Sequence, residues 1–357
     1  MYTSGTTGHP KGAVLTHRAV LANVAQIARV CQGRPAERSL VVAPLFHAGV
    51  VPTTFAPISW GGSLVILDQF DPVEVVRLLD QERIGIGVLV PAMLQACLDV
   101  PDATRRRYAH LRLIYYGASP IAEVTLRRAI ATFRCGFVQS YGMTEAVQSL
   151  TFLTPADHER ALAGNPGLLL SAGRAAADTE IRIVDADDAP VPDGAIGEVV
   201  ARGPQLMRGY WNLPEATAQT LRGGWLHTGD AGVMDSEGYL YIQDRVKDMI
   251  VSGGENIYPR EVEEILSKHP AVLEVAVIGV PDQRWGETVK AVVALREGTR
   301  ATAEQLIAFC RLRIGGFKLP RSVDFVPTLP RNAAGKVLKR ELRERYWAGR
   351  ARTVAGA

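Results

Sequence analysis

Residues 2–12 read YTSGTTGHPKG and combine hydroxyl side chains, glycines and one lysine. Glycines let a backbone turn tightly and approach a ligand closely. Hydroxyls and free N–H groups then donate hydrogen bonds, and Lys11 adds positive charge, so the segment predicts a phosphate cradle. It is not a Walker loop, because Pro10 and Lys11 follow its last turn and no strand precedes it in the sequence.

Two later segments place a carboxylate beside a glycine turn. Residues 139–145 read QSYGMTE and would present Thr144 and Glu145 at the end of a strand. Mg²⁺ needs only one or two carboxylates when substrate phosphates complete its shell, so Glu145 could hold it; alternatively, the two residues only start a helix. In residues 225–230 (WLHTGD), Asp230 could grip two ribose hydroxyls, or it could be a turn residue.

Two loops towards the end of the chain present further charge. Residues 244–259 (DRVKDMIVSGGENIYP) alternate charges before a strand enters a Gly-Gly turn. The same residues could instead form a solvent-exposed charged face followed by a hairpin, with no role in binding. Residues 330–336 (PRNAAGK) are rich in turn formers and present Lys336, although a lone lysine in a loop is usually only exposed to solvent.

The elements between these motifs predict an α/β region. Apolar residues recur at helical spacing over residues 13–30, which predicts a helix directly after the cradle. Strands then alternate with helices, which favours a mainly parallel sheet. The predicted strands are residues 40–44, 63–67, 86–90, 113–116 and 136–139, and the predicted helices are residues 71–81, a segment from Pro91, and residues 121–133.

The pattern changes after about residue 165. Short strands at residues 179–184, 197–202 and 239–243, with turn signals between them, predict a smaller antiparallel β-region. From Arg260 onwards we expect helices at 260–268, 302–315 and 338–347 and strands at 273–279, 289–296 and 322–326. We therefore predict an α/β fold with a large domain over residues 1–246 and a small, mobile α+β domain over residues 247–357.

Composition narrows the class of protein. A chain of 357 residues is long enough for two domains. The net charge of +3 is too small to argue for a nucleic-acid partner or a membrane surface. No apolar run is long enough for a transmembrane segment. Four widely spaced cysteines and no secretory signal favour the reducing cytoplasm. A homo-oligomer is left open.

Together and in this order, the motifs resemble the adenylate-forming superfamily, which includes acyl-CoA synthetases, peptide-synthetase adenylation domains and beetle luciferases. The resemblance covers residues 2 to about 347. The sequences of residues 252–259, 282–287 and 330–336 are most similar to those of fatty- and carboxylic-acid:CoA ligases. The resemblance implies that a carboxylic acid first attacks the α-phosphate of ATP, and that the thiol of coenzyme A then displaces AMP. It also implies Mg²⁺ as cofactor.

The resemblance assigns roles to the first motifs. Thr144 would bind the α-phosphate, Glu145 would bind Mg²⁺, and Asp230 and Arg245 would bind the ribose hydroxyls. The cradle for the β- and γ-phosphates would consist of Thr3, Ser4, Gly5, Thr6, Thr7, Gly8 and Lys11. The segment along the adenine would be Gly117, Ala118 and Ser119, with Tyr141 and Gly142 lining the pocket beside it.

The later motifs would serve the reacting groups. Lys336 would bridge the acid and the α-phosphate; because both are anions, positive charge at their meeting point has the largest effect on the barrier. Lys247 would be the hinge about which the C-terminal domain swings between half-reactions. Gly253, Gly254 and Glu255 would then approach the pantetheine of coenzyme A. His47 would lie at the gate of the acyl pocket, although a lone histidine is more often a core residue.

Relatives of this kind carry a sizeable region before the phosphate cradle, so we expect this chain to be a fragment of a longer protein. Two other functions stay open. One is adenylation followed by loading of a carrier-protein thiol. The other is a truncated remnant that binds nucleotide without turnover. The residues predicted for the acyl pocket are 46–50, 117–119 and 141–143. They are small, aromatic and apolar, so a fatty, alicyclic or aromatic acid would fit.

Overall fold

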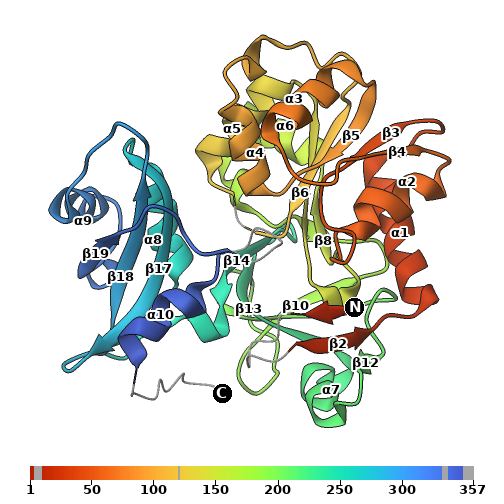
Figure 1. The fold of residues 1–357 in the computed structure, drawn as a ribbon. Helices are drawn as coiled ribbons and strands as arrows, with labels where there is room; N and C mark the ends of the chain where they lie inside the picture. Colours follow the sequence, from red (N-terminus) through yellow and green to blue (C-terminus); the bar gives the residue numbers. More distant parts are fainter. Residues whose placement is uncertain (4–9, 120, 332–336, 349–357) are drawn as a thin grey trace. The chain divides into compact units, whose positions relative to one another are not determined.

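The computed structural model describes residues 1–3, 10–119, 121–331 and 337–348. It divides the chain into two units (Figure 1). The first comprises Met1–Thr228 with Val233–Tyr241, and the second comprises Gly229–Gly232 with Ile242–Ala357. The second unit thus takes up the chain again a few residues before the predicted boundary after residue 246.

A seven-stranded sheet in the order β4-β3-β5-β6-β7-β8-β9 forms the centre of the first unit. Strands β4 to β7 in this order run parallel, and β8 and β9 are antiparallel to their neighbours. The predicted parallel-rich sheet is confirmed. The bounds are β3 Arg38–Val41, β4 Ser63–Ile66, β5 Ile84–Val88, β6 Leu113–Gly117, β7 Gly136–Tyr141, β8 Thr151–Leu153 and β9 Arg174–Ala175.

Helices cover both faces of this sheet (Figure 1). On one face Ile114 and Tyr116 pack in a cluster with side chains of α3 to α6, and on the other Leu113 and Tyr115 pack with α1 and α2. Successive residues of β6 therefore serve opposite layers, as strand geometry requires. The bounds are α1 His17–Cys31, α2 Ala56–Ser59, α3 Pro72–Gln81, α4 Pro91–Leu98, α5 Glu123–Phe133 and α6 Pro155–Ala163. Helix α7 (Pro214–Thr220) does not belong to these layers and packs next to residues 209–210.

The chain after the cradle is a strand before it becomes a helix. Strand β2 (Lys11–Val14) pairs antiparallel with β1 (Tyr2–Thr3) and with β12 (Gly209–Tyr210). Helix α1 begins only at His17, where the hydroxyl of Thr16 accepts the N–H of Ala19 at 3.1 Å. The predicted start of the helix at residue 13 was wrong, because a short apolar run fits either state and a remote strand recruits it here.

A second sheet has the order β10-β11-β13-β14. Strands β10 and β11 are antiparallel, as predicted for the β-region. Strand β13 was missed, because its glycine suggested a turn; Gly229 does have a left-handed φ of 70°, yet the strand continues through it. The bounds are β10 Glu180–Val184, β11 Gly197–Arg202, β13 Leu226–Met234 and β14 Leu240–Arg245.

The second unit is built around a long antiparallel pair, β17 (Val272–Asp282) and β18 (Gly286–Leu295). Along the edge of β18 that β17 leaves free, β19 (Ser322–Phe325) pairs in parallel with Lys290–Val293. A small hairpin of β15 (Ile250–Ser252) and β16 (Glu255–Ile257) pairs with the start of the same edge, at Gly286. Three helices complete the α+β arrangement that the sequence predicted: α8 Pro259–Ser267, α9 Ala303–Arg311 and α10 Lys339–Trp347.

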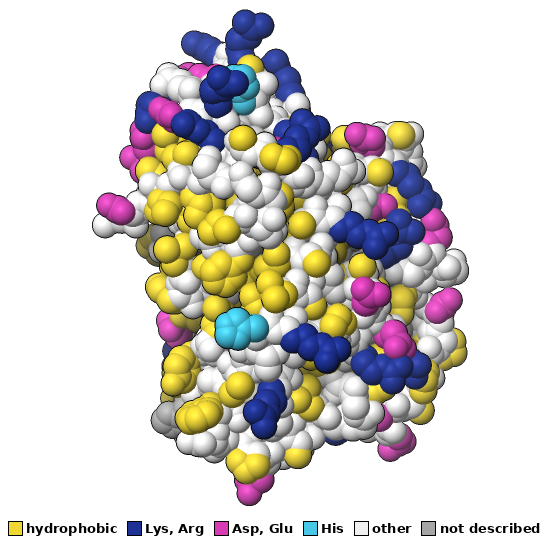
Figure 2. Space-filling model, turned by 90° about the vertical axis from the view of Figure 1, so that its right-hand side faces the viewer, with side chains coloured by type: hydrophobic (Ala, Val, Ile, Leu, Met, Phe, Trp, Pro, Cys, Tyr) yellow, Lys and Arg dark blue, Asp and Glu magenta, His cyan; other side chains and the backbone are white. Residues whose placement is uncertain are grey.

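Apolar side chains gather on the face of the first unit that carries α1, α2 and β4 (Figure 2). Leu21 is 65% exposed, Ile58 58% and Ile66 55%, and they come from these three elements. Strand β4 is also the edge of the seven-stranded sheet. Contiguous apolar surface of this kind is uncommon on free-standing soluble proteins. Among the described residues, no helix has the length and apolar character that crossing a membrane requires.

Candidate functional site

Predicted site residues meet at the carboxyl ends of the parallel strands. Gly117 at the end of β6 pairs with Ser140 of β7, so the loops that follow the two strands start side by side. A Cβ on Gly117 would lie 2.3 Å from the carbonyl oxygen of Ser140, so only glycine fits. Ala118 then has a φ of 68°, and it is exposed, whereas Ser119 after it is half-buried. Open α/β sheets bind ligands at this edge.

Glu145 follows β7 in a single 3₁₀ turn, Thr144–Ala146, and is buried. Tyr210 donates its phenolic hydrogen to Oε1 of Glu145 at 2.7 Å, and the N–H of Met207 donates to the backbone carbonyl of Glu145 at 2.7 Å. The turn has no side-chain cap, so Thr144 does not act as the helix cap that the sequence allowed. The carboxylate is therefore oriented from β12.

Gly142, between β7 and this turn, permits an even closer approach. A Cβ there would lie 1.9 Å from the carbonyl oxygen of Gln148. Its neighbour Tyr141 accepts the N–H of Leu150 at 2.8 Å through its carbonyl. The chain after β7 thus folds back on itself tightly, and this sets where Thr144 and Glu145 lie.

Lys11 belongs to the same group. Its Nζ lies 5.1 Å from the centre of the Tyr210 ring, and β2 and β12 pair through Ala13 and Tyr210. Tyr210 thus connects Lys11, at the end of the predicted phosphate cradle, with Glu145. Sequence reasoning missed Tyr210, because its strand has two residues and carries no pattern. Thr3 pairs with Lys11 at the base of the cradle; Ser4, Gly5, Thr6, Thr7 and Gly8 lie outside the described residues.

His47 lies in the segment that follows β3, at the same edge of the sheet. Its Nδ1 accepts the N–H of Gly49 at 3.2 Å. Burial lowers the pKa of His47, so the imidazole is neutral at neutral pH. The preceding Leu45 and Phe46 are exposed to 50% and 73%. The segment therefore offers a neutral imidazole beside accessible apolar side chains.

The two predicted ribose ligands form an ion pair. Nε of Arg245, at the end of β14, lies 2.8 Å from Oδ1 of Asp230 on the neighbouring β13. The Asp230 side chain is only 8% exposed, so solvent screens the pair weakly. The structure thus brings together two residues that are adjacent only through sheet pairing.

The Gly253-Gly254 turn joins β15 to β16. The two residues have φ values of 61° and 88°, which suits a two-residue hairpin turn. The N–H of Gly253 donates to the carbonyl of Trp285 at 2.9 Å. Asp282 in turn accepts the N–H of Trp285 at 2.9 Å. Residues 282–287 therefore support the turn, a contact that the sequence did not reveal. Glu255, beside it, is exposed.

Gly253→Ala should lower the free energy of unfolding of the second unit by about 1–2 kcal/mol, because it forces a Cβ into the left-handed region. The added atom would also lie 2.6 Å from the Trp285 ring. Gly298→Ala is the matched control, since Gly298 has a φ of 74° but no neighbour within 4 Å. Denaturant unfolding should show the larger loss for Gly253→Ala; equal losses would contradict the Trp285 contact.

Lys336 and the four residues before it lie outside the described residues. The structure does describe the residues at both ends of this loop. Arg331 and Val337 form a β-bridge, and the N–H of Leu338 donates to the carbonyl of Pro330 at 2.8 Å. Arg331 also lies 2.5 Å from Glu274 of β17. The base of the loop is thus fixed to the sheet of the second unit.

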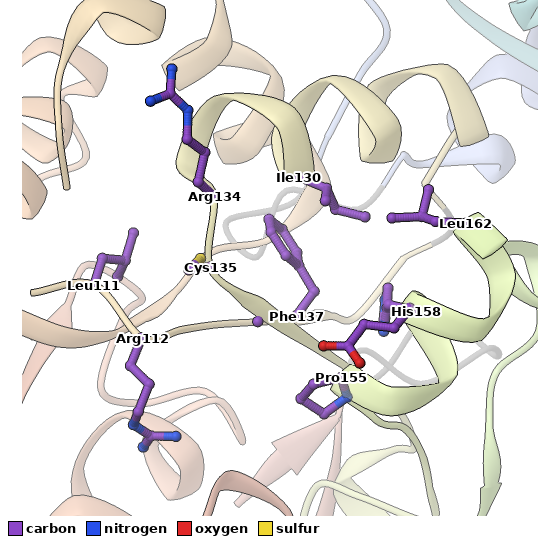
Figure 3. A pocket seen from close by; sticks show the side chains of 11 residues that line it. Leu111, Arg112, Ile130, Arg134, Cys135, Phe137, Pro155, His158 and Leu162 are labelled. Atoms are coloured by element: carbon purple, nitrogen blue, oxygen red, sulfur yellow. The ribbon is translucent and has the colours of Figure 1, made fainter. Parts of the chain in front are cut away.

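A cavity of about 450 Å³ in the first unit lies away from the predicted site residues at the carboxyl ends of the strands of that unit (Figure 3). It is at the amino end of β7, where Gly136 begins the strand, whereas Tyr141 ends it. Burial lowers the pKa of His158 there to about 4, and its Nε2 lies 2.9 Å from the hydroxyl of Tyr116. No predicted site residue lines this cavity, so we assign it no role.

One cluster has the composition of a metal site. Asp188, Glu198 and His227 place one ligand atom each within 4.8 Å of the others. However, Nη2 of Arg222 lies 2.8 Å from Asp188 and 3.3 Å from Glu198. A guanidinium therefore already supplies the positive charge between these carboxylates.

Comparison with known proteins gives the family. The AMP-binding enzyme family matches residues 1–211, and the C-terminal domain of AMP-binding enzymes matches residues 261–336. The chain is 42% identical over 361 residues to a medium/long-chain-fatty-acid–CoA ligase of Mycobacterium tuberculosis, which covers 99% of this chain and 62% of that protein. It is 43% identical over 351 residues to a feruloyl-CoA synthase of an Amycolatopsis species, covering 97% and 69%.

Solved structures agree. The amide bond synthetase of Marinactinospora thermotolerans superposes with a TM-score of 0.89 at 36% identity, covering 97% of this chain and 68% of that one. The chain therefore spans between about three fifths and seven tenths of the length of these relatives. The resemblance seen in the motifs is confirmed, and the chain belongs to the AMP-binding enzymes of the adenylate-forming superfamily.

Proposed function

We propose that the protein joins a carboxylic acid to coenzyme A in two steps, through an acyl-adenylate and with release of pyrophosphate and then AMP. The observation that carries the proposal is the connected group of Lys11, Tyr210 and Glu145 at the carboxyl edge of the parallel sheet. It joins a cation to an oriented carboxylate, and Glu145 follows β7, the strand that pairs with β6 through Gly117 and Ser140. The two curated relatives are themselves named as acid–CoA ligase and acyl-CoA synthase.

The residues at this edge suit Mg²⁺ bound together with phosphates. Glu145 is a buried carboxylate whose Oε1 accepts a hydrogen bond from Tyr210. One oriented carboxylate is enough for an ion that takes its other ligands from phosphate oxygens and water. When bound, the ion would neutralise charge on the phosphates. Lys11 would add a second positive charge on the side of the leaving pyrophosphate, and Thr144 would donate a hydrogen bond to the α-phosphate.

The first step needs orientation and charge more than proton transfer. A carboxylic acid is ionised at neutral pH, so it attacks the α-phosphate without a general base. The carboxylate and the phosphate repel one another, and a lysine that contacts both reduces this repulsion and aligns the reacting atoms. Lys336 is assigned this role on its motif. The Asp230–Arg245 pair would hold the ribose hydroxyls and so fix the nucleotide.

The second step would use the hairpin of the second unit. A rotation about Lys247 would carry Lys336 away and bring Ser252–Glu255 to the acyl-adenylate. The left-handed turn at Gly253 and Gly254 presents backbone without side chains, which lets a narrow pantetheine chain pass closely. The thiol of coenzyme A would then attack the acyl carbon, and AMP would leave.

The acid is proposed as fatty, alicyclic or aromatic. The segment that contains His47 offers the exposed side chains of Leu45 and Phe46. Because His47 stays neutral and its Nδ1 accepts the N–H of Gly49, its Nε2–H would donate a hydrogen bond near the carboxylate of the acid without adding a charge. Leu45, Phe46 and the neutral His47 carry no charge that would pair with a charged acyl chain.

The experiment is an assay of the purified chain with ATP, Mg²⁺ and a panel of fatty, alicyclic and aromatic acids, with and without coenzyme A. We expect pyrophosphate release that depends on the acid, and thioester and AMP that depend on coenzyme A. Thioester only on a phosphopantetheinylated carrier protein would indicate the carrier-loading alternative. Nucleotide binding by calorimetry, with no AMP or thioester from any acid, would contradict the proposal.

A further inference from the structure

Helix α10 holds the segment around the predicted hinge through partly buried ion pairs within the second unit. Nζ of Lys339 lies 3.1 Å from Oδ2 of Asp244 and 2.9 Å from Oε1 of Glu263. One turn further along the helix, Nη1 of Arg343 lies 2.5 Å from Oδ1 of Asp248. Residues 246–248 between these contacts form a single 3₁₀ turn.

These pairs are shielded from solvent. The side chains of Lys339 and Asp244 are 16% and 9% exposed, and those of Arg343 and Asp248 are both 12% exposed. Burial alone would lower the pKa of Lys339, but the carboxylates of Asp244 and Glu263 raise it above its usual value. Lys339 is therefore an ammonium ion at neutral pH, and salt screens its contacts weakly.

The two partners of Lys339 lie on opposite sides of Lys247 in the chain. Asp244 precedes it, whereas Glu263, like α10 itself, follows it. A backbone rotation at Lys247 would leave the Lys339–Glu263 pair intact, because both residues move together. It would separate Lys339 from Asp244.

The other contacts divide in the same way. The pair Arg343–Asp248 lies entirely after Lys247 and would be kept. Nη1 of Arg260 donates to the carbonyl of Ile242 at 2.7 Å, a contact that spans Lys247 and would open. Glu263 also accepts the N–H of Val277 on β17 at 2.7 Å, which fixes the carboxylate that retains the ammonium.

The geometry points to Lys339 as a positioning residue, which with Asp244 forms a latch that holds the hinge in one conformation and opens when the chain rotates at Lys247. Glu263 keeps Lys339 paired when the latch is open, so its charge is never left alone in the interior. This inference rests on the proposed function, because the two half-reactions are what require two conformations.

The first test is amide hydrogen exchange of the unaltered chain and of Asp244→Asn. An asparagine keeps the acceptor for the N–H of Arg245, which donates to Asp244 at 2.7 Å, and removes only the charge. We expect exchange at residues 245–249 to become about tenfold faster, with β17 and β18 unchanged. Glu344→Gln is the matched control, since Glu344 pairs with Arg340 on the exposed side of α10. Unchanged exchange at 245–249 would overturn the latch.

The second test measures acyl-adenylate formation and thioester formation separately. Because the latch favours one conformation, Asp244→Asn should change the two rates in opposite directions, while Glu344→Gln changes neither. Lys339→Met should act in the same way as Asp244→Asn, and Lys339→Arg should restore the unaltered ratio. Equal losses in both steps would overturn the proposal. If the unaltered chain catalyses neither step, the proposed function fails, and the exchange experiment still decides on the latch.

Discussion

Lys336→Ala is expected to lower the rate of acyl-adenylate formation by roughly 10²–10³-fold or more, the scale for removing one group that stabilises transition-state charge. Thioester formation from supplied acyl-adenylate should be largely spared, because the bond between the α- and β-phosphates of ATP is then already broken. Pyrophosphate exchange measures the first step, and single-turnover release of AMP measures the second.

Lys268→Ala serves as the control for this prediction. Lys268 is the C-cap of α8, is 43% exposed and pairs with Glu264 of that helix, so its loss removes a lysine charge of the second unit away from the Lys336 loop. The base of the Lys336 loop is fixed by the Arg331–Glu274 pair, which the Lys336 substitution does not touch. If both steps fall equally, the lysine does not act in one half-reaction alone, and the two-conformation mechanism is contradicted.

Glu145→Gln should lower adenylation by about 10²–10³-fold, since a bound metal supplies several kcal/mol of charge stabilisation. The amide oxygen can still accept from Tyr210, and the backbone contact with Met207 is unaffected. The fold should therefore persist. A titration of activity against Mg²⁺ should show saturation only at much higher metal concentration, and chelation should abolish the activity of the unaltered chain.

Tyr210→Phe should have a smaller effect of the same kind as Glu145→Gln. It keeps the ring next to Lys11 and removes the hydrogen bond to Glu145. Loss of a residue that orients a metal ligand typically costs 10–100-fold in metal affinity or activity. We expect an effect in that range and smaller than that of Glu145→Gln. An unchanged Mg²⁺ dependence in Glu145→Gln would show that Glu145 does not hold the ion.

Local signals explain which parts of the fold could be predicted. Asp71 accepts the N–H of Val73 at 2.9 Å and Pro72 follows, so the start of α3 was visible in two adjacent letters. The parallel strands β5 and β6 are buried throughout and appear as apolar runs. In contrast, one of the two strands that pair with β2 is β12, which lies far along the chain, and no local pattern predicts such a partner.

In the candidate site, too, some residues could be predicted from local motifs and others could not. The motifs named Glu145, Asp230 and Arg245 as functional residues, because their order along the chain is typical of a family. Tyr210, which orients Glu145, belongs to no motif, and the pairing of Lys339 with Asp244 joins two segments that are remote in sequence. The residues that we propose to contact substrate have a sequence signature here, whereas the residues that position them depend on the fold.

The antiparallel pairing of β17 and β18 also bears on how the protein acquires its structure. The two strands are joined by only residues 283–285 and pair from Val272–Leu295 down to Asp282–Gly286. Such local pairing closes small loops and forms rapidly, whereas the parallel strands of the first unit must meet across whole helices. During synthesis the amino-terminal part emerges first. The slowly forming sheet therefore has the longer time to assemble, and the rapidly forming unit is completed last.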